Sequence, residues 1–301
     1  LTMLRPAFVC GAIAGAVMGE AAASIENVSG SFTYDPKASA MMAALASIAY
    51  CSDIEAVTQW TCGTCRESGV PVVPGKVRVI DHSEITRRNS TRVFVGKLAE
   101  QDGCMMTFRG STNVANLLKD ISAWHVKPTT FEDCDGCRVE AGFYSVWKNV
   151  RERVFDGLRD VGCVAGGKDN KLYVTGHSMG AALTHLAMFS LENNGYDVQH
   201  SYSYEAPRVG NGAFSAEFTR RFGRSFPVFR VTHYKDPVVH LPFEWMGYKH
   251  VETEVYIDER GAYKVCKGTE DPTCSNQWLI DPLAVGYHCA SPLLPHGSIC
   301  N

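Results

Sequence analysis

The residues best suited to chemistry in this sequence lie in the stretch Gly176-His177-Ser178-Met179-Gly180. A β-favouring run, Leu172-Tyr173-Val174, precedes the stretch and an amphipathic helical pattern follows it, so the sequence predicts a strand, a tight turn and a helix. Glycines on both sides of such a turn let neighbouring backbone approach closely and leave Ser178 at its tip. This context, more than the short motif itself, is typical of a nucleophilic serine.

A serine hydroxyl becomes an effective nucleophile when a histidine takes its proton, and a carboxylate must orient that histidine. In an α/β-hydrolase the three groups follow in the order Ser, Asp or Glu, His. Asp236 directly follows a predicted strand and therefore fits the position of the acid. An ordinary turn residue before Pro237 would have the same surroundings.

Four histidines follow Asp236 in the chain, namely His240, His250, His288 and His296. His240 is too near Asp236 on one loop to approach the serine from a separate segment. His250 precedes a strand, where a buried and hydrogen-bonded imidazole is expected. Chain order therefore favours His288 as the base and leaves His296 as its main rival.

The tetrahedral intermediate of acyl transfer also needs donors for its oxyanion, normally the N–H after the nucleophile and another from a loop after an earlier strand. Met179 supplies the first donor. The turn Phe108-Arg109-Gly110-Ser111-Thr112 ends an upstream predicted strand, and the N–H and hydroxyl of Ser111 could supply the second. An ordinary Gly-Ser turn would have the same composition.

A short amphipathic helix is predicted just beyond this turn, because Val114, Leu117, Leu118 and Ile121 follow the spacing of one helix face. Beside an oxyanion turn, such a helix could cover the site in water and expose its apolar face to a lipid surface. A packed surface helix has the same pattern, so the spacing leaves both interpretations open.

The elements that must position these residues alternate along the chain. Strands are predicted at 77–80, 91–98, 104–108 and 226–232, and helices at 38–50, 144–161 and 213–222. This alternation is typical of an α/β fold with a mainly parallel central sheet flanked by helices, as in the α/β-hydrolases. The segments at 60–74 and from 281 onward are expected to be mostly loop.

The composition favours one large globular domain, which we expect to span residues 24–301. The chain has 301 residues, of which 45% are hydrophobic and 20% charged, enough for a sizeable core. A formal net charge of -3 without basic clusters argues against a nucleic-acid partner. The proposed chemistry needs no cofactor.

The beginning of the sequence has the order of a secretory signal peptide: Arg5, an apolar run at 7–19, and Ala21-Ala22-Ala23. We expect cleavage after Ala23, because the apolar run is shorter than the roughly 20 residues of a membrane-spanning helix. No other transmembrane candidate is present. Twelve cysteines suit an oxidising compartment, and cleavage would leave an odd number of them. Asn27 and Asn89 begin glycosylation sequons, which agree with secretion.

Taken together, the motifs resemble the fungal-type class 3 lipases, whose relatives include feruloyl esterases. The resemblance runs from about Asp35 to the end of the chain and rests on several ordered blocks. These are Phe108-Arg109-Gly110-Ser111, Cys134-Asp135-Gly136-Cys137, Val174-Thr175-Gly176-His177-Ser178-Met179-Gly180, Ala206-Pro207-Arg208-Val209-Gly210-Asn211, Arg230-Val231-Thr232-His233, Asp236-Pro237-Val238-Val239-His240-Leu241-Pro242 and Gly247-Tyr248-Lys249-His250.

The resemblance implies a role for each matching position. Ser178 would be the nucleophile, Asp236 the acid and His288 the base. Ser111 and Met179 would be the oxyanion donors, and residues 112–120 the lid.

The resemblance also implies four disulfides, which are Cys51–Cys300, Cys62–Cys65, Cys134–Cys137 and Cys266–Cys274. Of the other cysteines, Cys104 and Cys163 could pair, which leaves Cys289 as the candidate free thiol. The two Cys-x-x-Cys pairs are too far apart in sequence for a zinc site in a secreted protein, so no metal is expected.

The sequence therefore predicts a secreted serine hydrolase that acts on the carboxylic esters of acylglycerols at a lipid–water interface. A feruloyl-type esterase acting on cell-wall phenolic esters is one alternative, and a phospholipase A1 is another. A catalytically inactive lipid-binding protein on the same fold is the alternative from outside the enzymes. The apolar lid positions favour the lipase, because a lid over soluble phenolic esters needs no apolar underside.

Overall fold

The computed structural model describes residues 33–81, 91–99, 103–114, 118, 121, 124–131, 133–223 and 228–294. The expected signal peptide at 1–23, the sequon asparagines Asn27 and Asn89, Leu117, His296 and Cys300 lie outside these residues. No helix in the described segments combines the length and apolarity that crossing a membrane requires.

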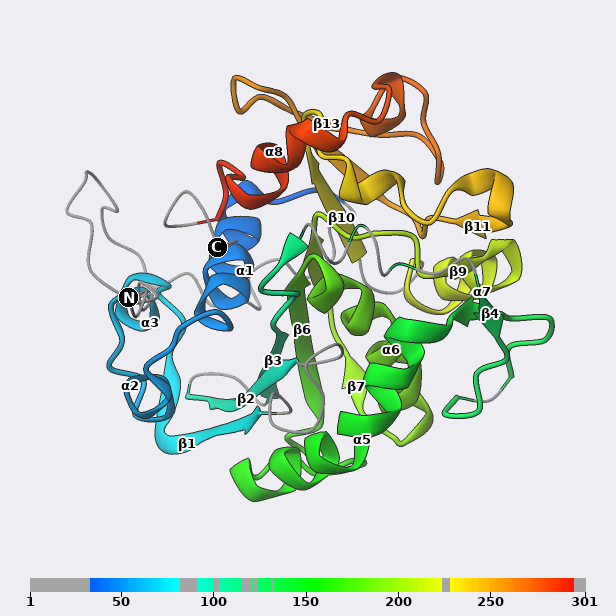
Figure 1. Ribbon diagram of the computed structural model, residues 1–301. Coiled ribbons are helices and arrows are strands. Elements are labelled where there is room, and N and C mark those ends of the chain that lie inside the picture. Colours follow the sequence, from blue (N-terminus) through cyan, green and yellow to red (C-terminus); the bar gives the residue numbers. More distant parts are fainter. Residues whose placement is uncertain are drawn as a thin grey trace, which may run out of the picture.

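A nine-stranded sheet forms the centre of the molecule (Figure 1). Its strands run in the order β1-β2-β3-β6-β8-β10-β12-β13, with β7 beside β6. Their bounds are β1 (Val72–Asp81), β2 (Arg92–Leu98), β3 (Gly103–Phe108), β6 (Lys171–His177), β7 (Asp197–Val198), β8 (Ser201–Tyr204), β10 (Val228–His233), β12 (Glu254–Ile257) and β13 (Tyr263–Val265).

The middle of this sheet is parallel from β3 through β6, β8 and β10 to β12. Strands β1, β2 and β13 join it antiparallel at its two sides. Parallel neighbours need helical crossovers, which explains the alternation of strand and helix patterns in the sequence. The prediction of an α/β fold with a mainly parallel sheet is confirmed.

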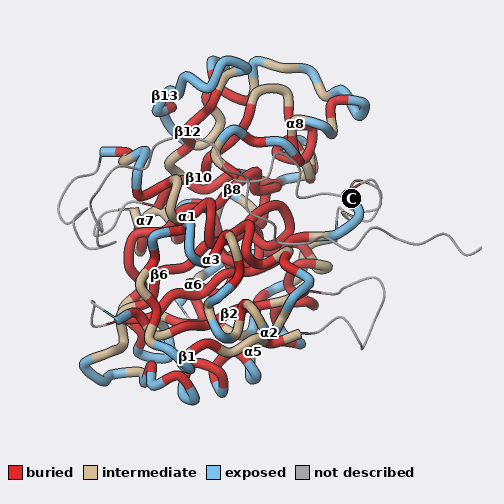
Figure 2. The backbone as a smooth tube through the Cα atoms, turned by 90° about the vertical axis from the view of Figure 1, so that its left-hand side faces the viewer, coloured by how far each residue is buried: buried red, intermediate tan, exposed pale blue. Residues whose placement is uncertain are grey.

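Helices cover both faces of the sheet (Figure 1). Helix α1 (Pro36–Ile48) packs on one face. Asp35 caps its N-terminus, where the Asp35 side chain accepts a hydrogen bond from the N–H of Lys37. Helices α5 (Ala141–Val161) and α6 (Met179–Asn193) pack on the other face. Figure 2 shows that buried residues fill the centre of the molecule and that exposed residues lie mainly at its periphery.

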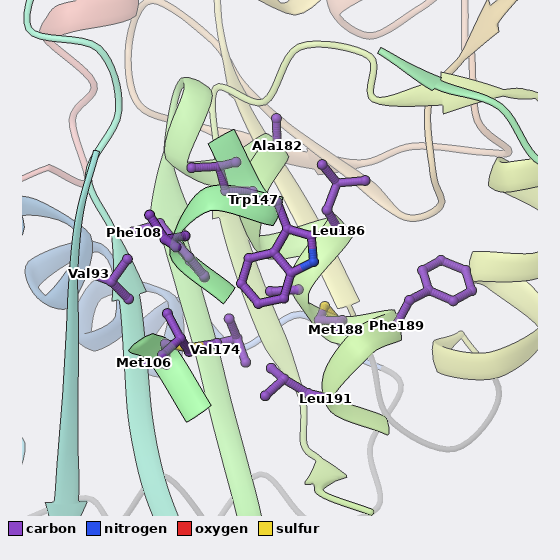
Figure 3. Packing of buried hydrophobic residues seen from close by; sticks show 14 of the residues in the cluster. Val93, Met106, Phe108, Trp147, Val174, Ala182, Leu186, Met188, Phe189 and Leu191 are labelled. Carbon is purple, nitrogen blue, oxygen red and sulfur yellow. The ribbon is translucent and has the colours of Figure 1, made fainter. Parts of the chain in front are cut away.

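The two faces of the sheet form separate hydrophobic cores, because alternate residues of a strand point to opposite sides. Met106 of β3 packs with α5 and α6, while its neighbour Met105 packs with α1. In the first core, Trp147 of α5 lies among Phe108, Val174 and Leu186 (Figure 3). Its indole N–H donates to the hydroxyl of Ser190, so the largest buried side chain there is also satisfied as a donor.

A small antiparallel sheet lies to one side, with the strand order β11-β9-β5-β4. Its strands are β4 (His125–Val126), β5 (Val139–Glu140), β9 (Gly210–Asn211) and β11 (Tyr248–Lys249), and α7 (Gly212–Phe222) follows β9. The remaining elements are short: α2 (Ile54–Thr58), α3 (Gly63–Glu67), η2 (Val238–His240), η3 (Glu244–Met246), η4 (Ser275–Gln277), η5 (Pro282–Ala284) and α8 (Val285–Cys289). Two segments expected to be loop therefore carry α3 and α8.

Four disulfides join described cysteines: Cys62–Cys65, Cys104–Cys163, Cys134–Cys137 and Cys266–Cys274. The three short pairings agree with those implied by the resemblance, and the pairing of Cys104 with Cys163 agrees with the sequence expectation. Cys289 is disulfide-bonded, so its assignment as the free thiol was wrong. Cys51 is also disulfide-bonded, but its predicted pairing with Cys300 lies outside the described residues.

The register of the parallel strands brings their ends to one edge of the sheet. Phe108 at the end of β3 lies opposite Gly176, and His177 at the end of β6 lies opposite Tyr204. Tyr204 in turn lies opposite Val231 of β10. The turns that follow these strands must therefore meet, which is where ligands bind in open α/β sheets.

Candidate active site

Ser178 occupies the turn between β6 and α6 in a strained backbone conformation, with φ 60° and ψ -128°. Its N–H donates to the carbonyl of Tyr204 at 2.9 Å, which fixes the turn against β8. Ser178 is fully buried, and its hydroxyl oxygen has no hydrogen-bond partner among the described residues. Strain of this kind is stable only where the surrounding structure imposes it, and it is concentrated at functional sites.

Two glycines permit this turn because no side chain fits at either position. A Cβ at Gly176 would lie 2.5 Å from the carbonyl oxygen of Gly180. A Cβ at Gly180 would lie 2.2 Å from the carbonyl oxygen of Phe108, at the end of β3. The start of α6 is therefore pressed directly against the strand that leads into the predicted oxyanion turn, as the sequence motif indicated.

Asp236 and His288 meet in the fully buried interior of this edge. The two lie 52 positions apart in sequence, and His288 Nδ1 is 2.8 Å from Asp236 Oδ2. The other carboxylate oxygen, Oδ1, accepts the N–H of Val238 at 2.8 Å. Because the carboxylate only accepts, Nδ1 carries the proton and Nε2 is left as the basic nitrogen. Nε2 is buried without a hydrogen-bond partner in the described segments.

The predicted oxyanion turn lies beside Ser178. A Cβ at Gly110 would come within 2.8 Å of the Ser178 Cβ, so the two turns are in direct contact. Met179 is the first residue of α6, and its N–H has no acceptor within the helix because the first four N–H groups of any helix lack one. The Ser111 hydroxyl is directed to the carbonyl of Asn113 at 3.4 Å, which leaves the backbone N–H of Ser111 as the predicted second donor.

A series of hydrogen bonds through Tyr50 and His177 connects the predicted oxyanion turn to the segment of His288. His177 Nε2 lies 3.0 Å from the carbonyl oxygen of His288, and Nδ1 lies 2.8 Å from the Tyr50 hydroxyl. A carbonyl only accepts, so Nε2 is the donor and Nδ1 accepts from Tyr50. The same hydroxyl accepts the N–H of Gly110 at 3.1 Å. Sequence reasoning assigned no role to Tyr50.

The electrostatic surroundings keep the side chains of His177 and Tyr50 in this hydrogen-bond network neutral. Burial, and then the charge of His288, hold the pKa of His177 well below its usual range. Burial likewise raises the pKa of Tyr50. A neutral imidazole with both nitrogens engaged cannot exchange protons with substrate, so it acts as a fixed support.

A second buried carboxyl group, Glu205, lies beside Asp236. Glu205 directly follows β8, is fully buried and adopts a φ of 53°. Its Oε2 accepts the N–H of His233 at 2.9 Å, while Oε1 has no hydrogen-bond partner among the described residues. Sequence reasoning missed this residue, although its position directly after a strand is the signal that identified Asp236.

The predicted lid residues are described in part. Val114 is buried in the core that contains Trp147, and Leu118 and Ile121 pack against that core. Val114 and Leu118 are helical, and Leu117 lies outside the described residues. Their apolar side chains therefore face the protein interior. A closed lid and a packed surface helix both fit this arrangement.

The other candidates are placed elsewhere or are engaged. His250 is buried, and its Nε2 lies 2.7 Å from the carbonyl oxygen of Val239, as expected for a structural histidine. One group of possible metal ligands occurs in the described segments, formed by Cys266, Asp271 and Cys274. The two sulfurs of this group are joined in a disulfide, so neither is a thiolate that could bind a metal.

Comparison with known sequences finds lipases. A family model described as lipase (class 3) matches residues 105–246. A secreted mono- and diacylglycerol lipase A of Penicillium camembertii is 41% identical over 153 residues, which are 51% of this chain and 47% of the relative. A secreted mono- and diacylglycerol lipase 1 of Fusarium solani is 28% identical over 238 residues, 76% of this chain and 68% of the relative. The chain thus spans about half the length of the first of these relatives.

Comparison with solved structures finds the same class of protein. The mono- and diacylglycerol lipase of Aspergillus oryzae superposes with a TM-score of 0.70 at 28% identity, covering 85% of this chain and 96% of that one. Lipase II of Rhizopus niveus superposes with a TM-score of 0.72 at 22% identity, covering 88% and 96%. The second similarity extends the agreement in fold, at an identity too low to carry function.

Proposed function

Because the chain belongs to the class 3 lipase family, we propose that it is a secreted serine hydrolase that cleaves the carboxylic esters of acylglycerols. The observation that carries this proposal is the meeting, at one edge of the sheet, of a strained serine turn, a glycine-lined oxyanion turn and a buried Asp236–His288 pair. Mono- and diacylglycerols are the first substrates to test, because two relatives are named as lipases of these esters.

In the proposed mechanism, Ser178 attacks the ester carbonyl while His288 Nε2 takes the hydroxyl proton. Asp236 holds the proton on Nδ1 and stabilises the imidazolium that forms. The N–H groups of Met179 and Ser111 bind the oxyanion of the tetrahedral intermediate. His288 then returns its proton to the departing glycerol oxygen. In the second half of the reaction, water attacks the acyl group on Ser178 while His288 takes a proton from that water. His288 finally returns this proton to the Ser178 oxygen as the fatty acid leaves.

No hydrogen bond joins the Ser178 hydroxyl to His288 Nε2 in this structure, where both atoms are buried and unpaired among the described residues. Contacts of this kind commonly tighten only when substrate binds. We propose that residues 112–120 act as a lid whose apolar side turns from the protein core to a lipid surface, which would admit substrate to the buried serine. The packing of Val114 and Leu118 on the core supports the closed position.

The test is hydrolysis of mono-, di- and short-chain triacylglycerols across their solubility limits, beside a soluble feruloyl ester and a phospholipid. The purified protein is compared with Ser178→Ala, and Ser275→Ala serves as a matched variant of a serine outside the site. We expect ester hydrolysis that rises when an emulsion forms, and a loss of about 10⁴-fold or more in Ser178→Ala.

Hydrolysis of the feruloyl ester or the phospholipid alone would move the substrate class and refute the acylglycerol proposal. A wild-type protein that hydrolyses none of these esters would refute the enzymatic proposal itself and favour a lipid-binding role. A phosphonate ester that labels Ser178 stoichiometrically in the wild type separates an inactive preparation from an inactive protein.

A further inference from the structure

Glu205 is a buried acid that the proposed mechanism does not use. It extends from the end of β8, the strand between β6, which leads to Ser178, and β10, which leads to Asp236. Its N–H donates to the carbonyl of Val231 at 2.8 Å, and its Oε2 accepts the N–H of His233 at 2.9 Å. Glu205 is therefore fixed against β10 through its backbone N–H and its Oε2, close to the turn in which β10 leads to Asp236.

No lysine or arginine in the described segments forms an ion pair with Glu205 or with Asp236. The groups that face Glu205 are the Asp236 carboxylate and the backbone of His233 on the β10 side, and the hydroxyl of Ser291 on the tail. The Ser291 hydroxyl is also buried and unpaired among the described residues. Two imidazoles belong to the buried corner formed by Glu205 and Asp236. One is the ring of His288, which is hydrogen-bonded to Asp236, and the other is the ring of His233.

The His233 ring is not a counter-charge for this pair. Its Nδ1 donates to the carbonyl of Tyr287 at 2.9 Å, and burial lowers the pKa of the ring, so it is neutral at neutral pH. His288 already binds Asp236 through Nδ1. Two carboxylates without a compensating cation in a buried corner cannot both be ionised at low cost.

From this geometry we propose that Glu205 is a positioning residue of the active site, a neutral acid that shares its proton with Asp236 and holds the Asp236 carboxylate on His288. The pair then carries one negative charge. Asp236 receives hydrogen bonds from Val238, His288 and the Glu205 acid, and the unpaired oxygen Oε1 of Glu205 gains a role as the donor.

The ionisation of Glu205 agrees with this arrangement. Burial, and then the charge of Asp236, raise the pKa of Glu205 well above its usual range. A carboxyl group whose pKa is raised on folding stabilises the protein fully below its unfolded value, about 4.3. That contribution is lost as the pH rises towards the folded value. Loss of the Glu205 proton would place two negative charges in the corner and displace Asp236 from His288.

Glu205→Gln is the decisive variant, because an amide keeps a donor for Asp236 but cannot ionise. We expect its midpoint of thermal unfolding to rise relative to wild type by about 2–4 °C for each pH unit above pH 5, until Glu205 itself ionises. The infrared band of a protonated carboxyl group should be present in wild type at pH 7 and absent from Glu205→Gln. Both measurements are repeated in the Ser178→Ala background, so they do not depend on activity.

Glu270→Gln is the control, since Glu270 is a largely buried glutamate, with 11% of its side chain exposed, that faces an arginine. Its pKa is lowered, because the charges of His250 and Arg208 outweigh the effect of burial. We expect no carboxylic acid band to disappear in this variant, and its loss of stability relative to wild type should shrink as the pH falls through the acidic range. The opposite pH dependence separates a neutral from an ionised buried glutamate.

The catalytic part of the inference rests on the proposed function and has its own readout. We expect kcat of wild type to fall about tenfold for each pH unit above the pKa of Glu205, and this fall to be absent from Glu205→Gln. Glu205→Ala should lower kcat about tenfold or more at pH 6 with KM unchanged, and the Gln variant should restore it. Glu217→Gln, on the outer helix α7, should follow wild type throughout.

Suppose the difference in unfolding midpoint between wild type and Glu205→Gln stays constant with pH, and wild type shows no carboxylic acid band at pH 7. This result would show that Glu205 is ionised and would overturn the proposal. A band and a pH-dependent stability gain, combined with an unaltered kcat in Glu205→Ala, would overturn the positioning role. Failure of the ester hydrolysis assay in wild type leaves the infrared and stability results able to decide on the shared proton.

Discussion

Buried and largely buried glutamates occur in two different surroundings in the described part of this molecule. At the edge that carries Ser178, Glu205 faces another carboxylate and no described cation. In the second setting, Glu270 faces Arg208 and Glu254 faces Arg230. The Arg208 guanidinium binds Glu270 through two contacts of 2.9 and 2.8 Å, and Arg230 lies 3.0 Å from its cross-strand partner Glu254.

The pKa values move in opposite directions in the two settings. Burial and Asp236 raise the pKa of Glu205, whereas at Glu270 the charges of His250 and Arg208 outweigh burial and lower it. The pKa of His250 is itself held well below its usual range by burial and then by Arg230, so Arg208 is the effective cation. A fixed cation keeps a buried carboxyl group ionised, and the group then serves as a structural element. Without a cation, the ionisation of the group depends on the neighbouring acid.

Asp236→Asn should have the largest effect on the cation-free side of this comparison. An asparagine amide can donate to Nδ1 of His288, which would place the proton on Nε2 and remove the base. We expect kcat/KM for acylglycerol hydrolysis to fall about 10⁴-fold, with little change in stability. Asp156→Asn, on the exposed side of α5, is the control. A loss below tenfold would show that Asp236 is not the acid.

Arg208→Met should have the next largest effect and should act on stability. It leaves the largely buried Glu270 carboxylate without its cation, which costs about 3–5 kcal/mol of the free energy of unfolding. Denaturant unfolding measures this loss, while kcat of the folded fraction should stay near that of wild type. Adding Glu270→Leu should recover the part of the loss that comes from the unpaired charge, while the carbonyls of His240 and Pro242 stay without their Arg208 donor. A double variant as unstable as the single one would contradict this account.

Tyr50→Phe should have the smallest effect, because it removes hydrogen bonds within a neutral network. The lost hydroxyl donates to His177 and accepts from Gly110, so we expect a cost of about 1–3 kcal/mol in stability. A looser oxyanion turn should also lower kcat about tenfold without changing KM. Tyr263→Phe, half-exposed on β13, is the matched control. Equal kcat values for the two variants would limit Tyr50 to a structural role.

The sequence predicts the parts of the site that local patterns determine. The serine turn and the position of Asp236 follow from strand patterns that end in glycine or in an acid, and the structure places both where these patterns indicated. Their catalytic roles remain predictions. Chain order favoured His288 as the base but could not exclude the other histidines. Its helix α8 is five residues long and lies in a segment whose sequence is typical of a loop.

The parts that sequence reasoning missed depend on contacts between distant segments. Tyr50 lies two residues beyond the end of α1, and only the packing of α1 on the sheet brings its hydroxyl to Gly110 and His177. Glu205 was open to prediction, since it follows β8 as Asp236 follows β10, but the triad pattern asks for one acid and Asp236 had already supplied it. The cationic partner that distinguishes Glu270 from Glu205 is visible only in three dimensions.

The tail that carries His288 is held by two imidazoles, since the carbonyls of Tyr287 and His288 accept from the rings of His233 and His177. All described strands end by residue 265, and α8 begins only at Val285. During synthesis, the ribosome therefore completes both sheets, Ser178 and Asp236 before the proposed base emerges. On the proposed mechanism, the nascent chain should be inert towards esters until its tail docks. A protease that cuts near the exposed Leu279 or Leu283 would break the chain between the sheets and His288 and leave the strands of both sheets uncut.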